Sequence, residues 1–186
     1  MAVSDYVIEK LYSTFYDDIN GARIDKILKV SEKNIAFILY HKGKTKTLLL
    51  SMSPTLPLFL LGEDLVSFVE ETSGFYSLLK KYFEYGQILS FEKIPSDRII
   101  KIKVRKRLPT YVYLESTLVF EMIPMRANII ILDSNNKIID AYHKSEGFEG
   151  KHVLIKGLNY IAENPEDRII KENDNLESIR YKWTSL

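Results

Sequence analysis

The chain has 186 residues, 46% of them hydrophobic and 27% charged, which is enough to bury a sizeable core and is typical of one globular domain. Twenty-six lysines and arginines oppose 25 aspartates and glutamates, and this near balance excludes a global electrostatic attraction to nucleic acid or membrane. The sequence has no cysteine, which excludes disulfides, thiolate catalysis and cysteine-ligated metals.

The amino terminus carries acidic residues where a signal peptide needs basic ones. The longest apolar stretch, residues 55–62, is interrupted by Pro57 and is too short to span a bilayer. We therefore expect a cytoplasmic protein that does not associate with membranes.

The first residues predict a helix. Ser4 is a suitable N-cap residue, apolar residues then recur at intervals of three and four up to Ile19, and Gly21 stands where such a helix would end. From residue 23 the period changes to two, which predicts three antiparallel strands over 23–30, 34–41 and 45–52.

Residues 53–67 are expected to be irregular, because Pro54 and Pro57 disrupt both a helix and a central strand. A second helix is predicted from about residue 75 to 85, with its apolar side facing inward and Gly86 near its end. Five more strands are predicted over 87–94, 98–106, 110–123, 128–133 and 138–144.

The predicted elements are two main helices and about eight strands, mostly in hairpin order. This pattern predicts an α+β fold built around an antiparallel β-sandwich or barrel. We expect one domain over residues 1–160, followed at 161–186 by a polar, highly charged linker or the start of a further domain.

The chain has few residues suited to catalysis or metal binding. Its three histidines stand apart without metal-site spacing, and it has no phosphate-binding glycine loop and no acyl-transfer motif, so we expect no metal and no cofactor. Glu115, Glu121 and Asp133 could converge as general acid and base, but carboxylates beside strands are more often solvated or paired.

Basic residues are concentrated at 101–107, which contains five cations and no acid. On a strand, Lys101, Lys103 and Arg105 would share one face, either to meet phosphates or as a solvated face that discourages edge pairing. The adjacent Asp97 and Arg98 precede this strand and have two readings as well. They form an ion pair that fixes the turn, with Asp97 accepting backbone N–H groups, or they bind a charged partner.

Five stretches, in order, resemble the NFACT amino-terminal domain of the RqcH/fibronectin-binding-protein-A-like family, which has a eukaryotic relative in NEMF. They are GARIDKI (21–27), GKTKTLLLSMSP (43–54), FYSLLKKYFEYGQI (75–88), IPSDRIIKIKV (94–104) and EMIPMRANIIILDSNNKIIDA (121–141). The chain departs from the family pattern at residues 52–57 and 124–127.

The resemblance implies a non-enzymatic role in ribosome-associated quality control. Such proteins bind tRNA and large ribosomal subunits obstructed by peptidyl-tRNA, and support template-free tailing of the stalled chain, with alanine in bacteria. The resemblance makes Asp97 and Arg98 the signature pair for tRNA engagement. Secondary RNA-binding candidates are Arg23, Lys26, Arg126 and Asn128, and the last two would share a strand face if their segment is extended.

The resemblance also implies a fold similar to the amino-terminal sandwich of formamidopyrimidine-type DNA glycosylases, and a helix-hairpin-helix domain after residue 160. Those glycosylases use a proline amine after the initiator methionine, whereas this chain has Ala2 and Val3 there, so glycosylase chemistry is not expected. Two alternatives stay open: a surface adhesin that binds fibronectin, and a glycosylase-like nucleic-acid-binding protein without catalysis.

Overall fold

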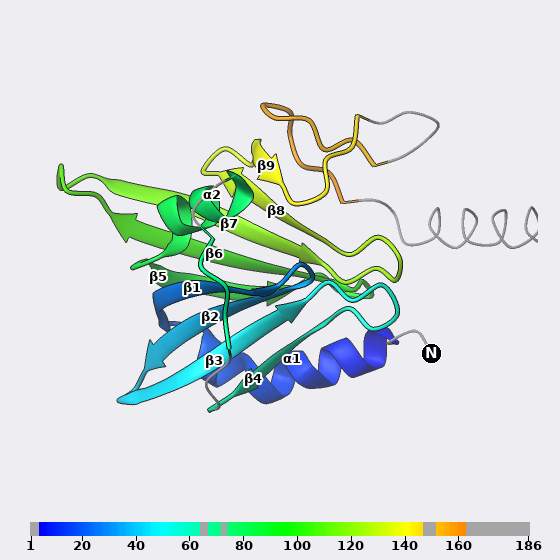
Figure 1. Cartoon of the computed structure of the whole chain (residues 1–186), viewed down its shortest axis with the longest axis horizontal. Helices are drawn as coiled ribbons and strands as arrows, with labels where there is room; N and C mark the ends of the chain where they lie inside the picture. Colours follow the sequence, from blue (N-terminus) through cyan, green and yellow to red (C-terminus); the bar gives the residue numbers. More distant parts are fainter. Residues whose placement is uncertain (1–3, 64–66, 72–73, 147–151, 163–186) are drawn as a thin grey trace, which may run out of the picture.

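The structure is a computed structural model that describes residues 4–63, 67–71, 74–146 and 152–162. Over this part of the chain it forms two helices and one nine-stranded antiparallel sheet, in the order β4-β3-β2-β1-β5-β6-β7-β8-β9 (Figure 1). The elements are α1 (Asp5–Ile19), β1 (Arg23–Ser31), β2 (Asn34–His41), β3 (Lys44–Ser51), β4 (Leu58–Gly62), α2 (Gly74–Phe83), β5 (Gln87–Lys93), β6 (Ile99–Arg107), β7 (Tyr113–Glu121), β8 (Asn128–Asp133) and β9 (Ile138–Ala141).

The predicted α+β class, both helices and all eight predicted strands are confirmed. One prediction about secondary structure is wrong. Residues 58–62, expected to be irregular, form the edge strand β4, which pairs with β3 from Ser51↔Leu58 to Thr47↔Gly62. Pro57 lies just before this strand, where a missing N–H removes no ladder bond. Most of the segment predicted as a linker, residues 163–186, lies outside the described residues.

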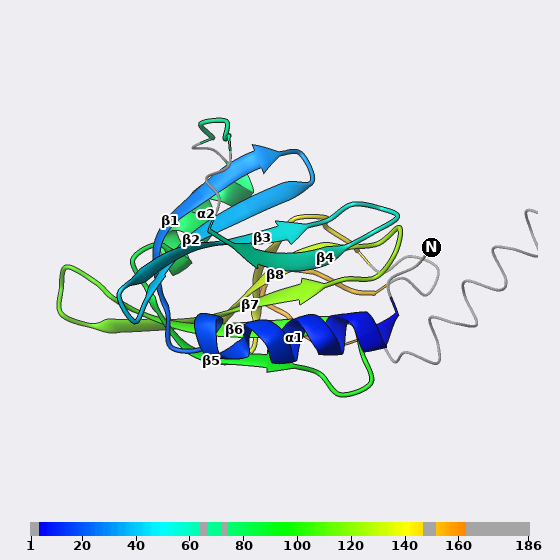
Figure 2. The ribbon, with the colours of Figure 1, turned by 90° about the horizontal axis from the view of Figure 1, so that it is seen from below.

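The sheet bends so strongly that its two halves face each other. β1 and β5 pair at Arg23↔Gln87, the first residue of each strand, and the halves diverge from that line. β1 to β4 form one layer and β5 to β9 the other, as the view from below shows (Figure 2). The result is the sandwich that the hairpin order predicted.

The two helices close the open sides of this sandwich. α1 packs against β4 and β5, and α2 packs against β1, β6 and β7. Aromatic rings join α1 to both layers: the Tyr12 ring lies 5.0 Å from Phe91 of β5, and the Phe15 ring lies 6.4 Å from Phe59 of β4. Tyr12 also donates a hydrogen bond from its hydroxyl to the Phe91 carbonyl, 3.1 Å away.

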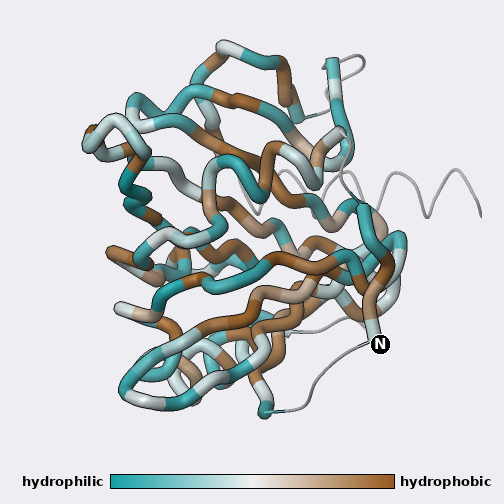
Figure 3. Tube along the Cα trace, turned by 60° about the vertical axis from the view of Figure 1, so that its left-hand side comes forward, coloured by the Kyte–Doolittle hydropathy of each residue, from teal (hydrophilic) through white to brown (hydrophobic). Residues whose placement is uncertain are grey.

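Hydrophobic residues are concentrated in the strands and in the inner faces of the helices (Figure 3). The alternation of period two explains this in β6, where Ile100, Ile102 and Val104 are buried while Lys103 and Arg105 are exposed. No helix in the described ranges is long and apolar enough to cross a membrane.

Gly86, between α2 and β5, occupies a position with no room for a side chain. A Cβ there would overlap Val104 Cγ1 and lie 2.9 Å from the Phe83 carbonyl oxygen. We expect Gly86→Ala to lower the free energy of unfolding by about 1–3 kcal/mol, because backbone must move to accept the methyl group. Urea denaturation measures this, and Ser77→Ala, at an exposed position of α2, is the control. Equal stability of the two variants would contradict the steric argument.

Candidate nucleic-acid interface

Asp97 and Arg98 lie in the turn between β5 and β6 and have different surroundings. Asp97 is only 5% exposed, and its Oδ1 accepts a hydrogen bond from the Arg98 backbone N–H, 2.7 Å away. The Asp97 N–H donates to the Ile94 carbonyl at 3.2 Å. Arg98 is half-buried. Asp97 therefore holds the turn by accepting a backbone N–H, as the structural reading predicted, and Arg98 is the more exposed member of the pair.

Two further loops lie beside this turn. The Met122 N–H, after β7, donates to the Arg98 carbonyl at 2.8 Å. The Met125 N–H, in the β7–β8 loop, donates to the Pro54 carbonyl of the β3–β4 loop, also at 2.8 Å. The β5–β6, β7–β8 and β3–β4 loops thus form one end of the sandwich, which we call the loop end.

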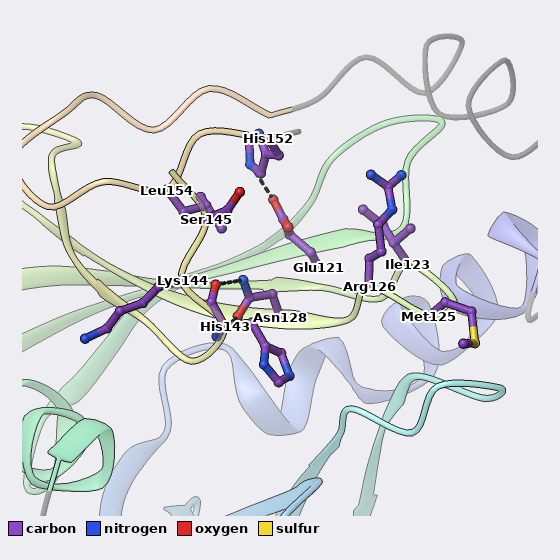
Figure 4. Close-up of a pocket in the computed structure, with 10 residues that line it drawn as sticks. All are labelled: Glu121, Ile123, Met125, Arg126, Asn128, His143, Lys144, Ser145, His152 and Leu154. Atoms are coloured by element: carbon purple, nitrogen blue, oxygen red, sulfur yellow. Dashed lines mark hydrogen bonds and ion pairs between the residues drawn. The ribbon is translucent and has the colours of Figure 1, made fainter. Parts of the chain in front are cut away.

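A cavity of about 350 Å³ opens at the loop end (Figure 4). It is lined by Glu121, Ile123, Met125, Arg126, Asn128, His143, Lys144, Ser145, His152 and Leu154. Arg126 is exposed, and Figure 4 shows its side chain directed away from Asn128. A neighbouring hollow of about 390 Å³, between the two layers, shares Met125 and His143 with it.

A buried carboxylate lies in the wall of the cavity. Glu121 is 3% exposed, and its Oε1 accepts a hydrogen bond from the Tyr160 hydroxyl at 2.7 Å. His152 Nε2 is 3.1 Å from the same oxygen. Sequence reasoning missed this cluster. The one signal in the sequence was Glu121 itself, an acid between the apolar residues of a predicted strand, and it did not identify Tyr160 or His152 as partners.

Asn128 lies at the cavity but is committed to the fold. Its Nδ2 donates to the His143 carbonyl at 2.8 Å, and its Oδ1 accepts from the His143 and Ile129 N–H groups, both at 2.9 Å. Asn128 and Arg126 do not share a strand face, because the segment is not extended through Arg126: β8 begins at Asn128, whereas Arg126 lies in the preceding turn, where its N–H donates to the Ile123 carbonyl at 3.0 Å. The loop brings both residues to one cavity all the same.

Arg23 and Lys26 lie on β1, outside the three loops that form the loop end. Arg23 begins β1 at the opposite end of the sandwich, paired with Gln87, and its Nε donates to Asp25 Oδ1 at 2.6 Å. Its guanidinium lies 5.0 Å from the centre of the Tyr40 ring. The structure thus brings four of the six candidate residues to one end and leaves these two elsewhere.

The basic stripe on β6 is partly neutralised. Lys103 and Arg105 both bind Glu115 of β7, with closest N–O distances of 3.2 and 2.6 Å. The Arg105 hydrogen bond, with that of Lys103, holds the pKa of Glu115 below its usual value. Since β6 lies inside the sheet, the reading that its charges discourage edge pairing is wrong.

The three carboxylates considered for acid–base chemistry do not converge. Glu115 and Glu121 lie at opposite ends of β7, and Asp133 accepts backbone N–H groups of Asn135 and Lys137 in the β8–β9 turn. Within the described ranges, no group of three histidine, aspartate or glutamate side chains could hold a metal ion.

Comparisons with known proteins identify relatives over most of the chain. A model of the NFACT N-terminal and middle domains matches residues 5–184. Rqc2 homolog RqcH of Streptococcus pneumoniae serotype 2 is 28% identical over 160 residues, which is 84% of this chain and 28% of that protein. Rqc2 homolog RqcH of Bacillus subtilis is 27% identical over 172 residues, 89% of this chain and 30% of that protein. The chain therefore spans less than a third of the length of these relatives.

Solved structures show the same fold. The N-terminal domain of fibronectin-binding protein PavA from Streptococcus pneumoniae has a TM-score of 0.79 at 24% identity, covering 86% of this chain and 61% of that one. The N-terminal part of the fibronectin/fibrinogen-binding protein of Streptococcus suis has a TM-score of 0.77 at 22% identity, covering 84% and 59%. Because the family model matches nearly the whole chain, the resemblance seen in the motifs is confirmed: the protein belongs to the NFACT family.

Proposed function

We propose that this chain is the RNA-contacting amino-terminal part of a ribosome quality-control factor. In this proposal it binds tRNA and the large ribosomal subunit obstructed by peptidyl-tRNA, and it supports template-free alanine tailing of the stalled chain. The observation that carries the proposal is membership of the NFACT family, with Rqc2 homolog RqcH proteins among the relatives. Peptide-bond chemistry would belong to the ribosome, so the domain needs no catalytic group.

The loop end is the surface that we assign to tRNA. Arg98 and Arg126 supply guanidinium groups there, and a planar guanidinium binds a phosphate or a base edge with two parallel hydrogen bonds. The cavity beside Arg126 offers a recess for an unstacked base, and sequence-specific RNA recognition favours such splayed bases. Asp97 and Asn128 hold the loops in place in this proposal. Arg23 and Lys26 remain candidates for a separate contact.

The central test removes the guanidinium of Arg98, which can make two parallel hydrogen bonds, but keeps the positive charge. We expect Arg98→Lys to raise the Kd for tRNA by about tenfold, since one charge-assisted hydrogen bond is lost. Fluorescence anisotropy with labelled bulk tRNA at one fixed salt concentration measures this, because affinity for RNA depends strongly on salt. Arg23→Lys, at the opposite end of the sandwich, is the control. Both variants keep the positive charge, so equal losses would mean that Arg98 contributes no more to tRNA binding than Arg23 does and that the loop end is not a distinct tRNA site.

A sedimentation experiment tests the ribosomal part of the proposal. The chain is layered with purified ribosomal particles on a sucrose gradient, and the RNA that travels with it is sequenced. We expect it to travel with large subunits that carry tRNA. If it stays at the top of the gradient with every particle, this chain does not attach to the subunit.

Fibronectin binding is the second candidate, favoured by the names of the solved relatives, which are fibronectin-binding proteins. Binding of the chain to immobilised fibronectin tests it, and Arg98→Lys should leave such binding unchanged. The glycosylase-like alternative depends on Ala2 and Val3, which lie outside the described residues. Binding to oxidised duplex DNA without strand cleavage in a nicking assay would support that alternative, whereas cleavage would mean glycosylase chemistry.

A further inference from the structure

The hairpin between β6 and β7 ends in an exposed cluster of tyrosines and arginines, far from the loop end. We call Arg105, Arg107, Tyr111, Val112 and Tyr113 the hairpin-tip patch. Tyr111 is 75% exposed, Val112 59% and Tyr113 60%. The hairpin projects beyond the rest of the sheet at the left of Figure 1, so its tip is open to a large partner.

Each arginine of this patch lies beside a tyrosine ring. The Arg107 guanidinium carbon lies 4.6 Å from the centre of the Tyr111 ring, and that of Arg105 lies 5.5 Å from the Tyr113 ring. Arg107 and Tyr113 are also cross-strand partners. Each guanidinium is therefore held beside a ring that keeps much of its surface in solvent, and a ring of this kind can stack on a base while the arginine meets a phosphate.

Tyr111 has a strained backbone that burial does not offset. Its φ of +63° is in the left-handed region, which is unfavourable for a bulky residue and easy for glycine or asparagine. The turn is closed by hydrogen bonds from the Leu108 N–H to the Val112 carbonyl and from the Tyr111 N–H to the Leu108 carbonyl. These bonds need no tyrosine side chain. A strained aromatic residue that is 75% exposed is better explained by binding than by folding.

The charge of the patch favours a polyanion. Glu115 is bound by Lys103 and Arg105, as described above. Across the part of the chain that the structure describes, no carboxylate forms an ion pair with Arg107. Among the described residues, Lys103 and Arg105 thus share one ion-pair partner and Arg107 has none, which leaves an excess of positive charge on these three side chains.

We propose that the hairpin-tip patch binds single-stranded RNA, as a contact separate from the loop end. Bases stack on Tyr111 and Tyr113, and Arg107 binds the backbone phosphate between them. Single-stranded RNA fits because it combines negative charge with exposed π-faces at every nucleotide. A hydrophobic protein partner fits less well, since Val112 is the one aliphatic side chain of the patch.

The test uses the 186-residue chain and a labelled 12-nucleotide oligouridylate, with the Kd measured by fluorescence anisotropy. We expect the double variant Tyr111→Ala, Tyr113→Ala to raise the Kd at least about tenfold through lost stacking. We expect Arg107→Gln to make the dependence of log K on log salt shallower by about 0.7, the value for one phosphate contact on a single strand. The control is Tyr6→Ala, which removes a ring that is 77% exposed on α1.

A third variant separates binding from folding. Tyr111→Gly relieves the left-handed strain, so it should not lower the Tm although it weakens RNA binding. The double variant should raise the Kd by the same factor in an Arg98→Lys background, so the patch is tested independently of the loop end. The proposal is overturned if the chain does not bind oligouridylate, or if Tyr6→Ala weakens binding as much as the double variant. It is also overturned if an oligoglutamate of equal charge competes as well as the RNA, which would indicate an acidic protein partner.

Discussion

Replacing Phe91 with alanine is expected to lower the free energy of unfolding by about 3–5 kcal/mol, the range for removing a buried phenylalanine ring. Phe91 is 1% exposed, and its ring centre lies 5.0 Å from that of Tyr12 and 5.7 Å from that of Phe59. These contacts join α1, β4 and β5. Since β4 belongs to one layer of the sandwich and β5 to the other, the ring connects the two layers. The cavity left by the ring would therefore weaken the packing of the two layers against each other and against α1.

Denaturant unfolding followed by far-UV circular dichroism measures this loss. Leu60→Ala is the matched control, because Leu60 is an apolar residue of β4 that is 44% exposed and should change stability by less than about 0.5 kcal/mol. Similar losses for the two variants would mean that the aromatic cluster does not join the layers as described.

Asn128→Ala should have the second-largest effect on stability, about 2–4 kcal/mol, because one small buried side chain satisfies three backbone groups, of which the Ile129 N–H is buried. Without the amide, both the N–H and the carbonyl of His143 lose their partners, and so does the Ile129 N–H. A polar group left buried without a hydrogen bond costs about 1–3 kcal/mol, which applies in full to the Ile129 N–H. The His143 groups cost less, because His143 is exposed and water can replace part of what they lose.

Thermal unfolding compares this variant with Asn135→Ala, which changes an exposed asparagine of the β8–β9 turn. A comparison of tRNA binding with the Arg98→Lys variant distinguishes two roles of Asn128. If it only positions the loop, tRNA affinity measured well below the Tm falls less in Asn128→Ala than in Arg98→Lys. Unchanged stability together with lost tRNA binding would instead make Asn128 a direct RNA contact.

Most of the fold could be predicted because its signals are local. The change of period from three or four to two after Gly21 separates α1 from β1 without any tertiary information. β4 was missed because the effect of proline on a strand depends on position in the sheet, and edge position is decided by the final topology. Pro57 precedes a strand that has a neighbour on one side only.

The candidate site was less predictable, because long-range contacts assemble it. Asp97 and Arg98 were identified as adjacent residues, but the burial of Asp97 depends on how the β5–β6 turn packs. Tyr160 and His152 reach Glu121 from a segment that has little periodicity of its own. No local pattern in the sequence could have indicated that contact.

The Met125–Pro54 hydrogen bond has a consequence for protein engineering. It joins the two stretches, 52–57 and 124–127, at which we expect this chain to depart from the family pattern. Grafting a relative's residues into one stretch alone would set them against an unaltered neighbour across the bond. A chimaera should therefore exchange both stretches as one unit, and the paired exchange should be better tolerated than either half.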